Sequence, residues 1–268
     1  MTDYSRELQF AKDLAYEAGK VMVKYLPASI KTVKQNSSPV TEADLIISKL
    51  VIASVKKHFP DHAIIDEEIE NTISKKEFVW VCDPIDGTIP FAAGVPTSMF
   101  SLGLCRNQKP VVAVCYDPYL KKLYFSSQNT GSFVNNRPIK TNENGFEKGE
   151  FVLAIPYWFD QFLKTKKFDT NLFFEKLHQK QIVLSLVESC VYSSMMVASG
   201  KVLAAVLPSA NPWDRAAAKL IVENAGGVNL DEKGSVLTVF GKHGLWIVSN
   251  RKVAKNMQQI VKESLLNS

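Results

Sequence analysis

Apolar residues at the start of the chain recur at the three-to-four-residue spacing of an amphipathic helix. The pattern covers residues 5–26 and ends at Pro27, which cannot continue a helix. A second helix is expected from Thr41, a favourable N-cap residue, to about His58. The chain therefore opens with two helices.

Short apolar segments separated by turn-like residues dominate the next part of the chain. They fall at residues 63–65, 78–82, 98–105, 110–116 and 122–126. Their length and spacing predict an antiparallel meander. The polar stretch 141–149 then predicts a surface loop between two halves, residues 1–145 and 146–268.

Strand and helix patterns alternate in the second half. Strands are expected at residues 151–155, 182–187, 202–207 and 245–248, and helices at 189–200, 213–225 and 252–265. Helices, then a meander, then alternating elements indicate an α/β fold in which sheets and helices form a layered sandwich. We expect a single domain over residues 1–268.

Composition narrows the class of protein. With 268 residues, 46% of them hydrophobic, the chain can bury a full core. A net charge of +5 without a long Lys/Arg block makes a nucleic-acid partner unlikely on electrostatic grounds. Four cysteines without metal-binding spacing, no signal peptide and no membrane-length apolar run predict a soluble cytoplasmic protein with no membrane partner.

The segment Asp83-Pro84-Ile85-Asp86-Gly87-Thr88 follows the apolar run of residues 78–82 and carries the most chemistry. Pro84 prevents further ladder pairing, so the strand passes into a tight turn. Two carboxylates three residues apart can share or bridge divalent cations, and the Ile85 carbonyl can point to the same place. Oxygen ligands favour Mg²⁺ over Zn²⁺. Ordinary turn chemistry is the alternative explanation of Pro-x-Asp-Gly.

Other acidic residues are further candidates, and each has an ordinary structural explanation. Asp44 is the last residue of a Thr-x-x-Asp capping pattern. Asp214 follows Pro212-Trp213 at an expected helix start, where it would favour the helix dipole. Asp66-Glu67-Glu68 could be a solvated loop.

Taken together, these segments resemble the inositol monophosphatase family of Mg²⁺-dependent, lithium-sensitive phosphatases. The resemblance runs nearly end to end, with the segments in the family's order: Ser38-Pro39-Val40-Thr41-Glu42-Ala43-Asp44, Asp66-Glu67-Glu68, Trp80 to Thr88, Pro212-Trp213-Asp214 and Glu223-Asn224-Ala225-Gly226-Gly227. It implies an α/β/α/β/α sandwich, commonly assembled as a homodimer.

The resemblance also implies the ligands of two to three Mg²⁺ ions. Glu67, Asp83 and the Ile85 carbonyl would hold one ion, and Asp83, Asp86 and Asp214 a second. A third, more weakly bound ion would contact Glu67 through a water molecule. Two ions about 3.5–4 Å apart can stabilise both the attacking and the leaving oxygen of an in-line displacement.

The remaining roles implied by the resemblance concern the attacking water and the phosphate. Thr88, paired with Asp44, would orient and deprotonate the water, and Glu67 completes the catalytic set. The backbone N–H groups of Gly87 and Thr88 would bind the phosphate at the start of the next helix. Gly87 permits a close approach because it has no Cβ.

The chain departs from the family pattern around the expected substrate wall. Glu188-Ser189-Cys190 stands where Gly-Ser-Ala is usual, and Leu207 stands where inositol-preferring members have an acidic residue. Glu188 is either a rim residue or a specificity contact. Glu188, Tyr192 and Asn211 are the candidate substrate contacts. Trp213 is expected to pack beneath Asp214.

The expected activity is Mg²⁺-dependent hydrolysis of a small phosphate monoester, either inositol-phosphate-like or another sugar or polyol phosphate. The alternatives are a 3′(2′),5′-bisphosphate nucleotidase, a histidinol-phosphate phosphatase, or a non-catalytic regulator that binds protein or RNA. The complete acidic set disfavours the regulator. A haloacid-dehalogenase-type phosphatase is set aside, because two residues separate Asp83 and Asp86 where that class has one.

Overall fold

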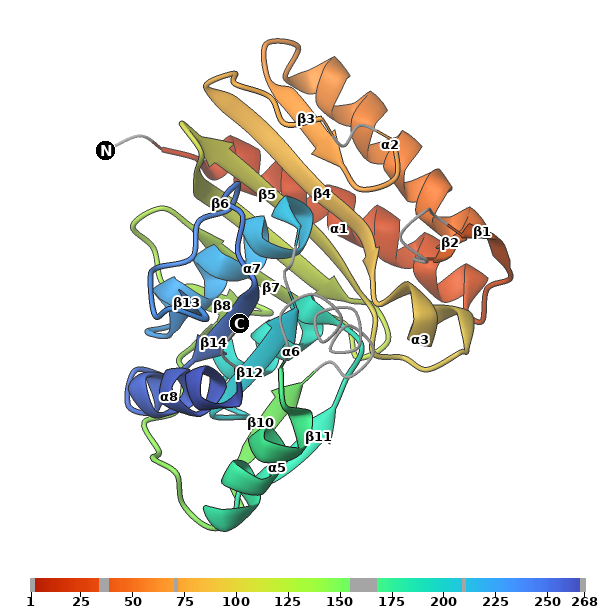
Figure 1. The fold of residues 1–268 in the computed structure, drawn as a ribbon. Helices are drawn as coiled ribbons and strands as arrows, with labels where there is room; N and C mark the ends of the chain where they lie inside the picture. The colour runs from red at the N-terminus through yellow and green to blue at the C-terminus, as the bar shows by residue number, and fades with distance from the viewer. Residues whose placement is uncertain (1–2, 34–38, 70–71, 155–167, 209–210, 266–268) are drawn as a thin grey trace.

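A computed structural model describes residues 3–33, 39–69, 72–154, 168–208 and 211–265. Two sheets and three groups of helices alternate in five layers, which confirms the layered α/β prediction (Figure 1). Each sheet is covered on both faces, so most strand residues are buried.

The larger sheet has seven strands in the order β3-β4-β5-β6-β7-β8-β9. Their bounds are β3 Ala63–Asp66, β4 Phe78–Asp86, β5 Met99–Arg106, β6 Lys109–Asp117, β7 Lys122–Ser127, β8 Ser132–Val134 and β9 Arg137–Ile139. From β4 to β9 consecutive strands pair antiparallel, as the meander predicts. The prediction is wrong for β3, which pairs parallel to β4; a parallel pair needs a connection longer than a hairpin turn, and Asp66 and Phe78 are far enough apart in the sequence to allow one.

Two helices cover the outer face of this sheet. Helix α1 (Ser5–Tyr25) packs on β5 and β6, and helix α2 (Glu42–His58) packs on β4. Both match the expected ranges. The Thr41 side chain accepts a hydrogen bond from the Asp44 N–H, and the Asp44 carboxylate accepts one from the Thr41 N–H, so the predicted capping box is present.

The smaller sheet has the order β11-β10-β12-β14-β13. Its strands are β10 Phe151–Ala154, β11 Val183–Leu186, β12 Ala204–Pro208, β13 Val228–Asp231 and β14 Leu245–Ser249. Strands β11, β10 and β12 run parallel, whereas β14 pairs antiparallel with β12 and β13. Every strand expected in this half is present in the described residues.

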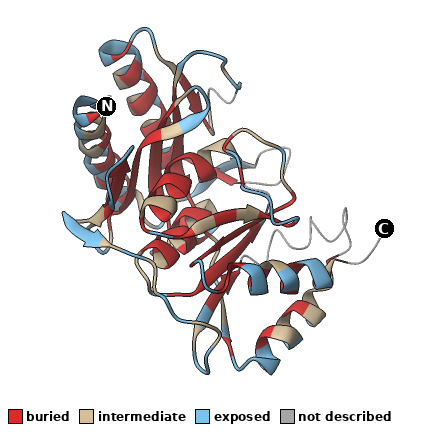
Figure 2. Cartoon of the chain, turned by 90° about the vertical axis from the view of Figure 1, so that its left-hand side faces the viewer, coloured by how far each residue is buried: buried red, intermediate tan, exposed pale blue. Residues whose placement is uncertain are grey.

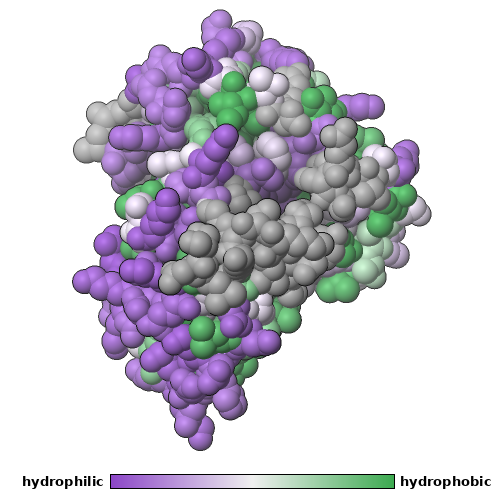
Figure 3. Space-filling model, in the orientation of Figure 1, coloured by the Kyte–Doolittle hydropathy of each residue, from purple (hydrophilic) through white to green (hydrophobic). Residues whose placement is uncertain are grey.

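Helices α6 (Cys190–Ala198) and α7 (Pro212–Asn224) lie between the two sheets. They are buried along most of their length, whereas α5 (Thr170–Gln179) and α8 (Ala254–Ser264) expose their outer faces (Figure 2). Hydrophilic side chains gather over this lower part of the molecule (Figure 3). The middle layer therefore packs against both sheets, in a cluster that combines apolar residues from each of them.

Several short elements were not predicted. They are the hairpin of β1 (Ile30–Val33) and β2 (Pro39–Thr41), the strands β8, β9 and β13, and helix α5. Asp169 is the N-cap of helix α5, and its carboxylate accepts the N–H of Leu172 at 2.9 Å. Within the described ranges, the helices are too short or too polar to cross a bilayer.

Candidate active site

A β-bulge at the end of β4 positions the first two carboxylates. Asp83 lies opposite Ser101 and Asp86 lies opposite Met99, so three steps along β4 match two along β5. The prediction that Pro84 prevents further pairing is wrong, because pairing resumes at Asp86 after a bulge that accommodates the proline. The additional residue bends β4 at this point. The Ile85 carbonyl accepts a hydrogen bond from the Thr88 hydroxyl at 3.1 Å, which closes the turn.

Gly87 turns the chain from β4 into the short helix α3 (Thr88–Ala92). Its φ of +87° is a left-handed conformation that glycine adopts without strain. A Cβ at this position would lie 3.0 Å from the backbone oxygen of Glu188. The turn is thus packed directly against the segment that leads into α6.

The first residues of α6 bind the carboxylate of Asp86. The Ser189 hydroxyl and the N–H groups of Cys190 and Val191 all donate to it, the two N–H groups at 3.2 and 2.8 Å. Residues more than a hundred positions apart therefore meet here. A carboxylate at a helix N-terminus is favoured because the free N–H groups carry partial positive charge.

The first turn of α7 brings the third carboxylate. Asp214 accepts a hydrogen bond from the Asn211 N–H, as in a capping box. One oxygen of Asp86, one oxygen of Asp214 and the sulfur of Cys190 all lie within 4.8 Å of one another. Two helix N-termini and one strand end thus converge on the same space.

Burial, together with the neighbouring negative charge, raises the pKa values of Asp83, Asp86 and Asp214. Burial raises the pKa of Asp83 well above its usual range, and the carboxylates of Glu67, Asp86 and Asp214 raise it further. The pKa of Asp214 is also raised well above its usual range, mainly by burial and then by the carboxylates of Asp86 and Glu67. The pKa of Asp86 rises to about 6, because burial outweighs the hydrogen bonds from α6.

The donor set of this cluster fits a hard divalent cation. Asp83 is only 1% exposed, and its Oδ1 has no hydrogen-bond partner among the described residues. A buried, unpartnered carboxylate oxygen among other carboxylates is costly unless a cation binds it. Mg²⁺ prefers such oxygen ligands.

Glu67 and Asp44 approach the site from other elements. Glu67 follows β3, and its N–H donates to the Cys82 carbonyl at 3.2 Å, so it lies beside the end of β4. Its charge acts on Asp83, Asp86 and Asp214. Asp44 is buried at the start of α2, where its carboxylate accepts from both the N–H and the hydroxyl of Thr41.

The structure places the candidate substrate contacts at different depths. Glu188 and Tyr192 are half-buried near the start of α6, and Asn211 is exposed at the start of α7. Leu207 is fully buried in β12 and packs in the core between the sheets. The half-buried Trp213 packs against an apolar cluster that includes Val81.

Comparison with known proteins decides the family. The model of the inositol monophosphatase family matches residues 3–266. The chain belongs to the inositol monophosphatase family. Members of this family are phosphatases, so this chain is a phosphoric monoester hydrolase.

Individual relatives of this inositol monophosphatase family member differ in their activities. The chain is 30% identical to a fructose-1,6-bisphosphatase/inositol-1-monophosphatase of Thermotoga maritima, over 84% of this chain and 82% of that protein. It is 31% identical to a histidinol-phosphatase of Chlorobaculum parvum, over 94% and 95% of the two chains. The solved inositol monophosphatase structure from Anabaena superposes with a TM-score of 0.84 at 26% identity, over 98% of each chain.

Arg215, which follows Asp214 directly in this family member, is a polar contact that was not predicted from the sequence. Arg215 is buried, and its Nη1 donates to the carbonyls of Thr238 and Gly241, each at 3.0 Å. Its Nε donates to the Asn211 carbonyl at 3.2 Å. The guanidinium thus ties the first turn of α7 to the loop between β13 and β14. The sequence offered one indication of a buried arginine, because Arg215 directly precedes three alanines.

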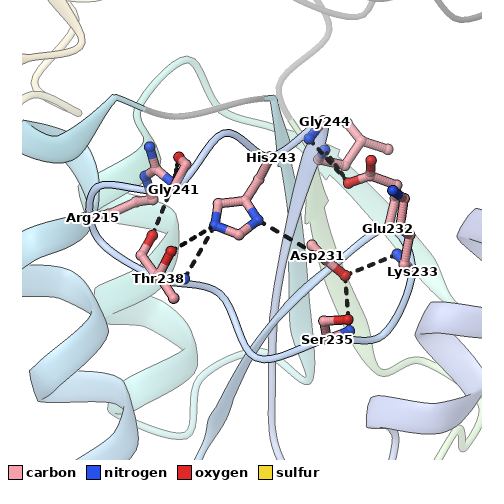
Figure 4. A network of polar contacts seen from close by, with 10 residues as sticks. Arg215, Asp231, Glu232, Lys233, Ser235, Thr238, Gly241, His243 and Gly244 are labelled. Atoms are coloured by element: carbon pink, nitrogen blue, oxygen red, sulfur yellow. Dashed lines mark hydrogen bonds and ion pairs between the residues drawn. The ribbon is translucent and has the colours of Figure 1, made fainter.

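A second set of contacts fixes that loop. His243 lies between Thr238 and Asp231, with its Nε2 3.1 Å from the Thr238 hydroxyl (Figure 4). The Asp231 carboxylate accepts the N–H groups of Lys233 and Ser235 (Figure 4). The part of the loop that carries the Thr238 carbonyl is therefore held by contacts outside the acidic cluster.

Ser189 and Cys190 were also not assigned roles. The motif Glu188-Ser189-Cys190 was noted only as a departure from the family pattern. An N-cap serine before an apolar helix was visible in the sequence, but its bond to Asp86 depends on how the two sheets pack.

Proposed function

We propose that this chain hydrolyses a small phosphate monoester with Mg²⁺, and that inositol phosphate or another sugar or polyol phosphate is its substrate. The observation that carries the proposal is the buried, unpartnered Oδ1 of Asp83 beside Asp86, Asp214 and Glu67. Four neighbouring carboxylates, those of Asp83 and Asp86 buried and those of Glu67 and Asp214 half-buried, call for divalent cations, and family membership supplies the reaction class.

In this proposal, five groups hold the two to three Mg²⁺ ions. They are the carboxylates of Glu67, Asp83, Asp86 and Asp214 and the carbonyl of Ile85. When bound, Mg²⁺ supplies a nucleophilic water and stabilises the charge on the phosphoryl oxygens. The Ile85 carbonyl has two lone pairs, so its bond to Thr88 leaves one available.

Thr88 and Asp44 handle the attacking water. The Thr88 hydroxyl donates its own proton to Ile85, so its oxygen can accept a hydrogen bond from water. Asp44 serves as the acceptor for the proton that the water loses. The N–H groups of Gly87 and Thr88 bind the phosphate where the turn passes into α3.

A histidinol phosphatase, or a nucleotidase acting on 3′-phosphoadenosine phosphate, is the second candidate. The observation that favours it is Leu207, an apolar and fully buried residue at the position where an acidic polyol contact was expected. A site without that partner should discriminate poorly for inositol. The 31% identity to a histidinol-phosphatase along almost the whole chain points the same way.

Phosphate release in the presence of Mg²⁺ tests both candidates. The substrates are inositol 1-phosphate, fructose 1,6-bisphosphate, 3′-phosphoadenosine 5′-phosphate and histidinol phosphate, with Asp214→Asn as the blank. Preference for inositol 1-phosphate or fructose 1,6-bisphosphate supports the proposal, and preference for either of the others supports the second candidate. No Mg²⁺-dependent turnover of any of the four would contradict both.

The family resemblance also supports a homodimer as part of this proposal. Sedimentation equilibrium measures the mass directly: twice the 29.9 kDa of one chain is expected, and a monomer at all concentrations would contradict it.

A further inference from the structure

Cys190 places a sulfur atom among the carboxylates of the site. Its Sγ lies within 4.8 Å of one oxygen of Asp86 and one of Asp214. It is buried at the first position of α6, directly after the N-cap residue Ser189. A donor set of one sulfur and two oxygens differs in kind from the oxygen-only set proposed for Mg²⁺.

The two oxygen donors are held by backbone contacts rather than by flexible side chains. Asp86 accepts the N–H groups of Cys190 and Val191, and Asp214 accepts the N–H of Asn211. The same N-terminal turn of α6 therefore orients both the Asp86 carboxylate and the Cys190 side chain. Backbone N–H groups thus hold both carboxylate donors, and the sulfur belongs to the residue whose own N–H binds Asp86.

Asp83 gives an independent indication that a cation belongs next to this cluster. Its Oδ1 is buried and unpartnered within the described part of the chain, and Asp83 lies on the other side of the β-bulge from the donor Asp86. A cation held by the three donors would lie where it compensates this charge as well. The electrostatics therefore favour a divalent cation.

Ligand softness determines which cation would use the sulfur. Mg²⁺ binds oxygen and gains nothing from a thiol, whereas Zn²⁺ binds thiolate and carboxylate together. Zn²⁺ with three protein ligands and one open position is a common arrangement. We propose that Asp86, Cys190 and Asp214 form a Zn²⁺ site, which overlaps the Mg²⁺ site and makes Zn²⁺ an inhibitor.

Binding forms a bond between zinc and the Cys190 sulfur and releases the thiol proton to solvent, without any change in oxidation state. In the metal-free protein, burial and the carboxylates of Asp214 and Asp86 raise the pKa of this thiol, so the proton is present before Zn²⁺ binds. The inhibition rests on the proposed function, whereas the binding itself does not.

The other buried cysteines offer a matched control. Cys105 is buried in β5 and packs with Val79 and Val81, away from α6. Cys105→Ala removes the same atoms as Cys190→Ala without touching the cluster. Cys190→Ser is a second variant, which keeps the size of the side chain and exchanges only the sulfur for a hard oxygen donor.

The test uses the full chain, stripped of metal with a chelator. Zn²⁺ affinity is measured by calorimetry, and Co²⁺ serves as a spectroscopic substitute that reports a sulfur ligand by its thiolate charge-transfer absorption. We expect the band in the wild type and in Cys105→Ala, and its loss in both Cys190 variants. Zn²⁺ affinity should fall at least about 10-fold in those variants, since even outer partners of metal sites contribute that much.

Equal Zn²⁺ affinity in the wild type and in the folded Cys190 variants, with no charge-transfer band in any of them, would overturn the inference. This failure is separable from a failure of the proposed function. If Mg²⁺-dependent phosphate release persists but replacing Cys190 leaves the Zn²⁺ affinity unchanged, only the zinc site is wrong. If the band is present but no phosphate is released, the zinc site stands and the proposed function is wrong.

Discussion

Two strands of the larger sheet pass into an Asp-Pro dipeptide, and the two aspartates have opposite surroundings. Asp83 in β4 and Asp117 at the end of β6 are 1% and 2% exposed. The Asp117 Oδ1 accepts the N–H groups of Tyr119 and Leu120, each at 2.9 Å. The Asp83 Oδ1 has no partner within the described ranges, and its neighbours are other carboxylates.

The comparison separates turn chemistry from ligand chemistry. An aspartate that binds the N–H groups two and three residues later stabilises its own turn and needs nothing else. One that is buried among like charges destabilises the folded chain until a cation binds. The same dipeptide at similar burial therefore has a structural role in β6 and, in our account, a chemical role in β4.

Replacing Asp83 in β4 should have the largest effect on activity. Asp83→Asn should reduce Mg²⁺-dependent phosphate release to background, because a central ligand is lost. Without metal the variant should melt at or above the wild-type temperature, since one of the repelling charges is removed. Phosphate release and thermal unfolding in chelator measure the two effects. Retained turnover would remove Asp83 from the ligand set.

Removing the Thr88 hydroxyl, which closes the turn after β4, should have the second-largest effect on activity. Thr88→Ala should lower kcat by about 10², the low end for losing a general-base step. Thr88→Ser keeps the hydroxyl and is the matched control, expected near the wild-type rate. Steady-state kinetics distinguish the roles: an effect on KM alone would mean that Thr88 only positions the phosphate.

Arg215 sharpens the comparison because it is a buried cation beside the acidic cluster. Arg215→Leu should lower the free energy of unfolding by about 3 kcal/mol, since the carbonyls of Asn211, Thr238 and Gly241 lose their donor. Urea denaturation with and without Mg²⁺ measures the loss. If Arg215→Leu were as stable as the wild type, the prediction would be wrong, because water would then satisfy the three carbonyls as well as the guanidinium does.

The smallest effect is expected at Asp117. Burial raises the pKa of its carboxyl above 3.8, so the folded chain holds the proton more tightly than the unfolded chain does. Its contribution to stability is therefore complete below 3.8 and is lost as the pH rises through the raised folded value. Asp117→Asn lacks this titration, and its amide oxygen can still accept both N–H groups.

The stability of Asp117→Asn relative to the wild type should accordingly increase as the pH rises from below 3.8 and then level off. Urea denaturation over a pH series measures the difference, and phosphate release should equal that of the wild type. A large loss of activity would break the comparison, because it would place Asp117 in the chemistry.

The ligand-bearing turn could be predicted from the sequence because its geometry is local. Pro84 lies in the β-bulge between Asp83 and Asp86, and Gly87 permits the left-handed turn that follows, so two carboxylates are held close together. The long helices and the meander were predictable for the same reason. Their apolar positions repeat at one period over many residues.

Features that depend on packing between distant segments could not be predicted. The bond from Ser189 to Asp86 spans 103 positions, and Arg215 reaches a loop more than 20 residues later. The parallel pairing of β3 with β4 could not be predicted, because the sequence of residues 67–77 carries no regular pattern. Helix α5 is only ten residues long, so its periodicity is weak.

Mg²⁺ binding to the two Asp-Pro sites tests the central claim most directly. Calorimetric titration of the metal-free wild type, Asp83→Asn and Asp117→Asn compares them under one condition. The account predicts that the wild type and Asp117→Asn bind Mg²⁺ equally, gaining about 2.7 kcal/mol of stability at a hundred times Kd, and that Asp83→Asn loses this binding. Wild-type Mg²⁺ affinity in Asp83→Asn would contradict the claim that the unpartnered oxygen of Asp83 is a metal ligand.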